Sequence, residues 1–438
     1  MHAVQLTRSS AAPYLNFRLL LLILSCFSFI LFLSLSSANN NIFSTFTPLR
    51  NFLSNLSSPS SHPLLLNSSD TTSKSVSDST QLRNGEKKKE LLLRSRIAVC
   101  LVGGARKFEL TGPSIVENVL NVYPNADLFL NSPLDRDSFK FSILKGIAPR
   151  IASIRIFKPT RLNETEFQRR VLTPRGSHNG IQGLLQYFNL VEGCLTLIKA
   201  FQIQNNFTYD WIVRTRVDGY WNAPLAPDNF LPNNHYLVPS GSRYGGCNDR
   251  LGIGNLNTSL IALSRLSLIP QLDAAGFRQI NSETSFKAQL TTQGVKFLEN
   301  RLPFCVVSKH RFKFPPKGLP VASMSSPGPL SGAYCRPCTP VCAGPCANDI
   351  MAILPIGFSR IDGEYGTVEL CDAHGEWESS WENNFDRFAG EKLAELRKQV
   401  MESKFEKCVK DFDEMKKRTV NWDSPPAKQI CGIASRRK

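Results

Sequence analysis

Histidine is scarce in this chain, with 6 in 438 residues. Those at His178, His235, His310 and His374 are too far apart in the sequence for a metal site that spacing alone would reveal. The chain also lacks the G-x-G-x-x-G pattern of a dinucleotide-binding turn, and it has no internal repeats. These absences exclude a histidine-spaced metal motif, a recognisable dinucleotide motif and a repeat architecture.

The chain has few acids relative to its basic residues, and its formal net charge is +16. The basic residues are scattered, however, and no run resembles a known nucleic-acid-binding motif. We therefore expect no nucleic-acid partner. Anionic substrates, proximity to a membrane or solubility account better for the excess of positive charge.

Near the N-terminus, an uncharged apolar run covers residues 19–35, close to the shortest length that crosses a bilayer as a helix. Arg8 and Arg18 precede it without acids, so the positive-inside rule places residues 1–18 in the cytosol and the body in the lumen. A cleaved signal peptide is the alternative, because Ser36, Ser37 and Ala38 offer small residues at a cut site. We expect a retained signal anchor in the Golgi membrane and a type II, single-pass topology.

Two further features indicate an oxidising compartment. Sequons for N-glycosylation follow the apolar run at Asn55, Asn67, Asn163, Asn206 and Asn257. Of the twelve cysteines, only Cys26 lies in the run, and the odd number beyond it implies at least one free or intermolecular thiol. The disulfide candidates are Cys247, Cys335, Cys338, Cys342, Cys346 and Cys371. The four at 335–346, spaced C-x2-C-x3-C-x3-C, could instead hold zinc, but in the lumen disulfides are favoured.

The rest of the chain divides by composition. A disordered Ser-rich stem is expected at residues 36–93 and an α/β domain at residues 94–314, where apolar strands alternate with amphipathic stretches. Strands are expected near residues 97–102, 126–130, 151–157, 236–239 and 303–307 and within 209–220, and helices near 112–122, 180–204 and 282–293. Residues 241–254 are expected to form a loop. A Pro/Gly- and Cys-rich extension (315–390), an amphipathic helix (391–418) and a basic tail (419–438) follow.

One stretch organises the rest, residues 209–220 with the sequence Y-D-W-I-V-R-T-R-V-D-G-Y. Side chains alternate along a strand, so Arg214, Arg216 and Asp218 share one face. Two guanidiniums and a carboxylate at a strand's end suit a phosphate-and-metal site, because arginine neutralises phosphate oxygens and a carboxylate ligates a hard cation. The alternative is a structural Arg–Asp pair before a turn.

Three other places carry candidate site residues. Gly103 and Gly104 follow the first strand, where backbone amides could meet a nucleotide and Arg106 its phosphate; an ordinary strand–helix turn is the alternative. Asp249 lies in a polar triplet, N-D-R, within a glycine-flanked loop; it could instead close a surface turn with an arginine. Glu283 begins a predicted helix, where it could serve only the helix dipole.

Taken in order, the anchor, the stem, I-A-V-C-L-V-G-G-A-R, W-I-V-R-T-R-V-D-G-Y, N-D-R-L-G-I-G and a helical acid resemble a luminal glycosyltransferase of the GT-A fold. The resemblance covers residues 96–309. The chain also looks like an uncharacterised family of plant type II membrane proteins with this layout. The resemblance implies a Rossmann-like, mainly parallel sheet, a nucleotide-sugar donor and a glycan or glycoprotein acceptor. It also implies that Asp218 holds Mn²⁺ or Mg²⁺ against the diphosphate, and that Glu283 or Asp249 is the base or contacts acceptor hydroxyls.

The sequence departs from this family at its metal motif, usually D-x-D, because Arg216 stands two residues before Asp218. Arg214 and Arg216 could then neutralise the diphosphate directly. Alternatively, the protein keeps the fold as a non-catalytic luminal glycan-binding or assembly protein. A third possibility is a secreted, disulfide-rich α/β protein whose signal is cleaved.

Overall fold

The computed structural model describes residues 85–232, 234–312, 321–353 and 367–435. The predicted cytosolic tail, the membrane segment, most of the stem, Asn55, Asn67 and Cys26 lie outside these residues. Among the helices of the described residues, none combines the length and apolar character needed to cross a bilayer. The described residues all fall in one unit, Lys74–Lys438.

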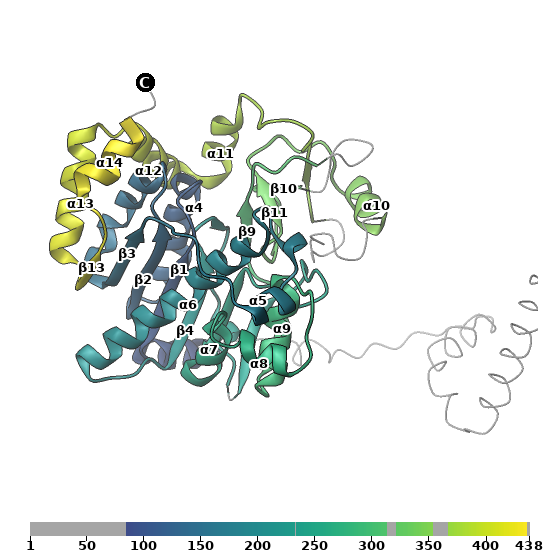
Figure 1. The fold of residues 1–438 in the computed structure, drawn as a ribbon. Coiled ribbons are helices and arrows are strands. Elements are labelled where there is room, and N and C mark those ends of the chain that lie inside the picture. The colour runs from purple at the N-terminus through teal and green to yellow at the C-terminus, as the bar shows by residue number, and fades with distance from the viewer. Residues whose placement is uncertain (1–84, 233, 313–320, 354–366, 436–438) are drawn as a thin grey trace, which may run out of the picture. The chain divides into compact units, whose positions relative to one another are not determined.

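The centre of the fold is an eight-stranded sheet in the order β13-β3-β2-β1-β4-β7-β6-β8 (Figure 1). Parallel pairing joins β3 (Ile151–Phe157), β2 (Ala126–Pro133), β1 (Ile97–Val102) and β4 (Trp211–Arg216). On the far side of β4, β7 (Leu251–Asn255) is antiparallel to β4 and to β6 (His235–Pro239), and β8 (Lys296–Asn300) is parallel to β6. The predicted α/β class is confirmed, and the sheet is mixed.

Helices cover both faces of this sheet. The core on one face unites β1 with α6 (Gly180–Asn205), α7 (Leu256–Leu263) and α9 (Ser282–Thr292). The core on the other face unites it with α4 (Phe108–Ile115), the π-helix η2 (Val116–Leu120) and the 3-10 segment η3 (Ser138–Arg150). Covered on both sides, β1 is buried along its whole length, which explains its continuous apolar sequence. Smaller helices complete the layers: α5 (Glu166–Val171), α8 (Ile269–Ala274), η4 (Pro174–Gly176) and η5 (Pro227–Asn229).

The prediction of a loop at residues 241–254 is wrong at its end, because β7 is a central strand. Its two glycines have low strand propensity, so the sequence did not predict a strand here. The contacts of these glycines explain why they are present. A Cβ at Gly252 would lie 2.2 Å from the hydroxyl oxygen of Tyr236, and one at Gly254 would lie 2.5 Å from the same ring. Glycine in this strand therefore marks the close approach of an aromatic ring.

A second, five-stranded sheet has the order β12-β10-β11-β9-β5. Its strands are β5 (Gly219–Trp221), β9 (Phe304–Val307), β10 (Val321–Ser323), β11 (Tyr334–Arg336) and β12 (Leu370–Cys371). Strand β11 pairs in parallel with β9, and β9 pairs antiparallel with β5. This sheet contains strands from both sides of the predicted domain boundary at residues 314 and 315. The Cys-rich extension is therefore part of the same sheet as the end of the α/β domain. Helices α10 (Pro345–Ile353) and α11 (Trp381–Ala389) belong to the same region.

The cysteines of this region form disulfide bonds, as predicted. The pairs are Cys305–Cys335, Cys338–Cys371 and Cys342–Cys346, with Cys100–Cys194 and Cys408–Cys431 elsewhere. The four clustered cysteines therefore form disulfides rather than a zinc site. The prediction that Cys247 forms a disulfide is wrong, because Cys247 is a buried free thiol. The odd number of cysteines beyond the apolar run predicts such a thiol, and Cys247 is that residue.

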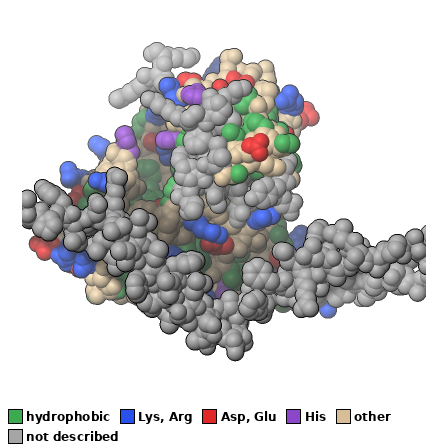
Figure 2. Space-filling model, turned by 90° about the vertical axis from the view of Figure 1, so that its right-hand side faces the viewer, with side chains coloured by type: hydrophobic (Ala, Val, Ile, Leu, Met, Phe, Trp, Pro, Cys, Tyr) green, Lys and Arg blue, Asp and Glu red, His purple; other side chains and the backbone are tan. Residues whose placement is uncertain are grey.

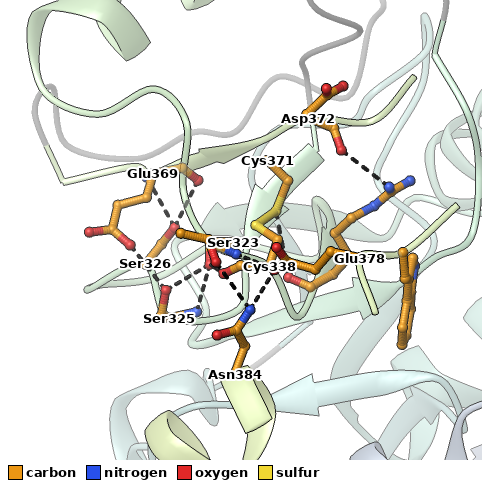
Figure 3. Close-up of a disulfide and its surroundings, with 12 residues drawn as sticks. Ser323, Ser325, Ser326, Cys338, Glu369, Cys371, Asp372, Glu378 and Asn384 are labelled. Atoms are coloured by element: carbon orange, nitrogen blue, oxygen red, sulfur yellow. Dashed lines mark hydrogen bonds between the residues drawn. A yellow bond between two sulfur atoms is a disulfide. The ribbon is translucent and has the colours of Figure 1, made fainter. Parts of the chain in front are cut away.

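Hydrogen bonds between serines and Glu369 lie close to the Cys338–Cys371 bridge (Figure 3). Ser326 donates through Oγ to the carbonyl of Glu369 and accepts from the Glu369 amide, both at 3.1 Å. Ser325 donates to the Glu369 carboxylate at 3.0 Å. Short strands with few ladder bonds are thus held by covalent and side-chain links.

The C-terminal predictions need correction. Residues 391–418 form two helices, α12 (Glu391–Met401) and α13 (Phe405–Arg418), rather than one. The expected tail contains β13 (Asn421–Asp423), which pairs in parallel with β3, and α14 (Ala427–Ser435). Figure 1 shows these yellow elements beside β3. At the other end, residues 85–94 are helical and bury Leu92, so the folded body begins before the predicted end of the stem.

Basic side chains are visible on one face of the protein (Figure 2). On the face in Figure 2, the described Lys and Arg side chains lie in several separate places. The sequon asparagines Asn163, Asn206 and Asn257 are all exposed. Their glycosylation remains a prediction.

Candidate functional site

The site is built where the strand order reverses. From β1 the chain proceeds to β2 and β3 on one side, and then returns to β4 on the other side of β1. The residues that follow β1 and β4 therefore leave the sheet at the same edge, with Val102 and Arg216 paired in register. In an open α/β sheet, such a switch point at the carboxyl ends of the strands leaves a crevice for a ligand.

A cleft of about 530 Å³ lies at this switch point. We call it the switch-point cleft. Arg106 follows β1, Arg216 and Asp218 lie at the end of β4, and Ser308, Lys309 and His310 follow β9. The other lining residues are Lys107, Glu109, Arg136, Asp137, Lys140, Val306, Val307, Tyr334, Trp381 and Met401. The structure thus brings together three of the six predicted donor-binding residues.

Arg216 and Asp218 form a bidentate ion pair at the base of this cleft. The Nε and Nη2 atoms of Arg216 donate to the two carboxylate oxygens of Asp218, each at 2.7 Å, and Nη2 of Arg106 lies 3.8 Å from the same carboxylate. Burial alone would raise the pKa of Asp218, but the Arg216 guanidinium outweighs burial and holds that pKa below its usual value. Asp218 is therefore an ionised, fully engaged carboxylate.

The glycine turn after β1 is shaped by its contacts. Gly103 has a φ of 125°, which favours glycine, and a Cβ at Gly104 would lie 2.5 Å from Oδ2 of Asp135. That carboxylate accepts the amide of Ala105 at 3.1 Å. The two glycines are thus explained by turn geometry, and Arg106 is the residue of the turn that lines the cleft.

A buried lysine supports the same turn. Lys140 lies 2.7 Å from Glu109 and 3.0 Å from Asp137, with all three side chains at most 8% exposed. Its ammonium also donates to the carbonyl of Arg106 at 3.1 Å. Two of the cleft's three carboxylates are therefore paired with one lysine that also positions Arg106.

Arg214 and Asp249 lie in a second, sealed cluster. Arg214 donates to the backbone carbonyl of Asp249 and to the hydroxyl of Tyr187. The Asp249 carboxylate accepts from Ser282 at 2.5 Å and lies 3.5 Å from Arg265. Burial would raise the pKa of Asp249, but the arginines hold it low. The expectation of a flexible loop acid is wrong, because Asp249 is 5% exposed and held from several sides.

Glu283 adjoins this cluster but is less enclosed. It lies in the first turn of α9, where the side chain of Asn281 caps the helix by accepting the amide of Thr284 at 2.8 Å. Burial, together with the negative charge of Asp249, raises the pKa of Glu283 to about 7. A carboxyl that titrates near neutrality can act as a base, whereas Asp249 is fixed as an ion-pair partner.

An arginine connects the two clusters. The guanidinium of Arg250 lies 4.3 Å from the ring centre of Tyr334, which lines the cleft, and 6.0 Å from that of Tyr244. Arg250 also lowers the pKa of Glu283 against the larger effect of burial. Glu283 therefore interacts electrostatically with Arg250, whose guanidinium packs on a ring that lines the cleft.

The residues do not offer a good divalent-cation site. In the described part of the chain, no three His, Cys, Asp or Glu side chains gather closely enough to hold a metal ion. Asp218 would have to give up two charge-assisted hydrogen bonds from Arg216 to become a ligand. The metal that the resemblance implied therefore does not fit Asp218 as it is arranged here.

The sequence did not predict several of the residues that line the cleft. Ser308, Lys309 and His310 directly follow β9, and this polar run after a predicted strand could have been flagged. Tyr334 and Trp381 come from the Cys-rich region and carry no local signal. Lys107 was also missed, although it follows the glycine turn immediately.

The chain belongs to a family described as a domain of unknown function, DUF7796, whose family model matches residues 92–437. A search of curated proteins finds no match.

Proposed function

We propose that this DUF7796 member transfers a sugar from a nucleotide-sugar donor to a hydroxyl of a glycan or glycoprotein. We place it in the secretory pathway, as a type II protein anchored in the Golgi membrane. The observation that carries the proposal is the cationic cleft at the switch point between β1 and β4. The parallel order β3-β2-β1-β4 also supports the finer expectation of a Rossmann-like, GT-A sheet.

The residues divide naturally into two roles. Arg106 and Arg216 in the cleft would hold the donor's diphosphate and offset the charge on the leaving group. Glu283 would accept the proton of the acceptor hydroxyl, whose oxygen bonds to the anomeric carbon as the bond from that carbon to the diphosphate breaks. The nucleoside diphosphate then leaves with the electron pair. A pKa near 7 suits Glu283 to this step.

A second candidate function, glycan binding or assembly without catalysis, is favoured by one observation. Both oxygens of Asp218 are engaged by Arg216, and Asp249 is sealed by Ser282 and Arg265. Two of the three acids that the resemblance singled out are thus structural partners of arginines. A protein that retains the fold for binding alone would also have this arrangement.

Donor hydrolysis by the purified full-length protein tests the proposal. We expect release of nucleoside diphosphate from at least one nucleotide sugar, and its loss in Asp218→Asn while circular dichroism shows that the variant remains folded. Asp423→Asn is the matched control, because Asp423 is 76% exposed at the far edge of the sheet. If no nucleotide sugar is bound or hydrolysed, the enzymatic proposal fails; if the donor binds without turnover, the binding function is favoured.

A further inference from the structure

We infer that the switch-point cleft binds a nucleoside diphosphate through its own cationic side chains, with Asp218 acting as a positioning residue for Arg216 rather than as a metal ligand. This inference rests on the proposed function and specifies how its donor site works. It follows from which charges in the cleft are already paired and which are available.

Each described carboxylate that lines the cleft is already paired with a basic side chain. Asp218 is held at both oxygens by Arg216, and its side chain is 11% exposed. Glu109 and Asp137 flank Lys140 at 2.7 and 3.0 Å, with side chains 4% and 8% exposed. A divalent cation entering here would have to displace a buried or half-buried cation from each acid, which costs the pairing energy of that acid.

Cations are in excess in the same cleft. Among the described residues, six lysine and arginine side chains line it against three carboxylates, so positive charge remains after each of these acids is paired. The side chains of Arg106 and Arg136 are 72% and 70% exposed, and Lys309 is exposed as well. Arg106 and Arg136 lie 3.8 and 3.5 Å from Asp218 and Asp137, but their exposure lets them turn toward an anion, as it does for Lys309.

Arg216 has donors left for a phosphate. Its Nε and Nη2 atoms are used on Asp218, which leaves Nη1 available from a planar group that carries five N–H donors. The bidentate pair fixes the plane of the guanidinium, and a fixed plane lowers the entropy lost when an anion binds. Asp218 therefore prepares Arg216 without touching the donor.

Aromatic side chains favour a nucleoside over a bare diphosphate. Tyr334, His310 and Trp381 line the cleft, and the His310 ring stacks on that of Tyr334 with an interplanar angle of 26°. Aromatic faces stack on nucleobases whatever the base. The phosphate end and the base end of a nucleotide thus both find suitable surfaces in one cleft.

The test is calorimetric binding of UDP, GDP and inorganic pyrophosphate to the full-length protein, in a chelator and in Mn²⁺ or Mg²⁺. We expect a nucleoside diphosphate to bind with a Kd that chelation changes by less than about twofold. Arg106→Ala and Lys309→Ala should each weaken binding roughly tenfold to a hundredfold, as expected for loss of one charge-assisted hydrogen bond. Arg161→Ala, whose side chain is 80% exposed outside the cleft, should leave the Kd unchanged.

The positioning role of Asp218 has its own readout. Asp218→Asn should weaken binding equally with and without metal, because the loss is in the orientation of Arg216. The inference would be overturned if the wild type bound only with Mn²⁺ or Mg²⁺ and if Asp218→Asn abolished that metal-dependent binding. That outcome would leave the proposed function standing. Pyrophosphate binding as tight as that of UDP and GDP would overturn the nucleoside assignment. Absence of binding under every condition would overturn the proposed function as well.

Discussion

The ammonium group of Lys107 lies 3.7 Å from the centre of the Trp377 ring. Trp381 lies on the same cation, at 5.2 Å, and the indole nitrogen of Trp377 donates to the carbonyl of Ser308 at 3.1 Å. A lysine from the turn after β1 is thus enclosed by two tryptophans from the Cys-rich region. This contact attaches that region to the switch-point cleft.

The first prediction concerns the stability that depends on Lys107. Burial lowers the pKa of its ammonium from 10.5 to about 8, against an opposing effect of Glu109. Between these pH values the unfolded chain binds a proton that the folded chain has released, so the free energy of unfolding rises with pH. In urea titrations from pH 7 to 11, the wild type should gain stability relative to Lys107→Met across this window.

Lys87→Met is the control, because Lys87 is exposed and its removal should leave the shape of the pH profile unchanged. A constant difference between wild type and Lys107→Met at all pH values would contradict the prediction.

The second prediction concerns Glu283. Its folded pKa of about 7 exceeds its ordinary value of 4.5, so the folded chain holds a proton that the unfolded chain has lost between these values. Stability relative to Glu283→Gln should therefore fall as pH rises from 4.5 to 7. If Glu283 is the base, sugar transfer should rise with a midpoint near pH 7 and vanish in the variant. A stability effect without an activity effect would limit Glu283 to a structural role.

The third prediction tests the packing of Tyr236 on β7. Gly252→Ala should cost about 2 kcal/mol or more, because the new methyl would overlap the Tyr236 ring. Gly146→Ala is the matched control, since a Cβ there meets nothing within 4 Å, and it should change stability by less than about 0.5 kcal/mol. In a Tyr236→Ala background the cost of Gly252→Ala should shrink, and equal costs in both backgrounds would refute the contact.

The fourth prediction concerns the free thiol. Cys247 is fully buried, and burial raises the pKa of its thiol to about 12. In a Cys26→Ser variant, a thiol reagent should find no reactive group in the native protein and one per chain after unfolding without reductant. More than one would mean that a disulfide described above is not formed.

The sequence predicted the elements whose signals are local. Strands β1 and β3 match their predicted bounds. Helix α6, predicted from apolar spacing, and helix α9 match theirs within one residue at each end. What escaped depends on partners distant in sequence. The glycines of β7 lie against Tyr236. The short strands β10, β11 and β12 pair with one another, and β11 and β12 also carry disulfide-bonded cysteines.

In the candidate site too, local sequence patterns predicted some features, whereas others depend on residues distant in the sequence. Alternation along β4 correctly separated Arg214 and Arg216 from the apolar face, but it could not tell that they belong to different clusters. Two residues along a strand span about 6.6 Å, so side chains on one face can meet different surroundings. Here Arg214 lies under Tyr187 and Asp249, whereas Arg216 reaches the cleft. Cysteine parity predicted a free thiol but not which one, because pairing depends on Cα separation in the fold.

The place of β13 has a consequence for biosynthesis. This strand comes from the end of the chain, yet it borders β3, and the amide of Ile156 donates to the hydroxyl of Ser424 across 268 residues. A growing polypeptide emerges from the ribosome N-terminus first. The β3 edge of the central sheet therefore stays uncovered until residues 421–423 have been synthesised. A chain that stops before residue 421 would leave β3 as a bare edge open to pairing with other chains.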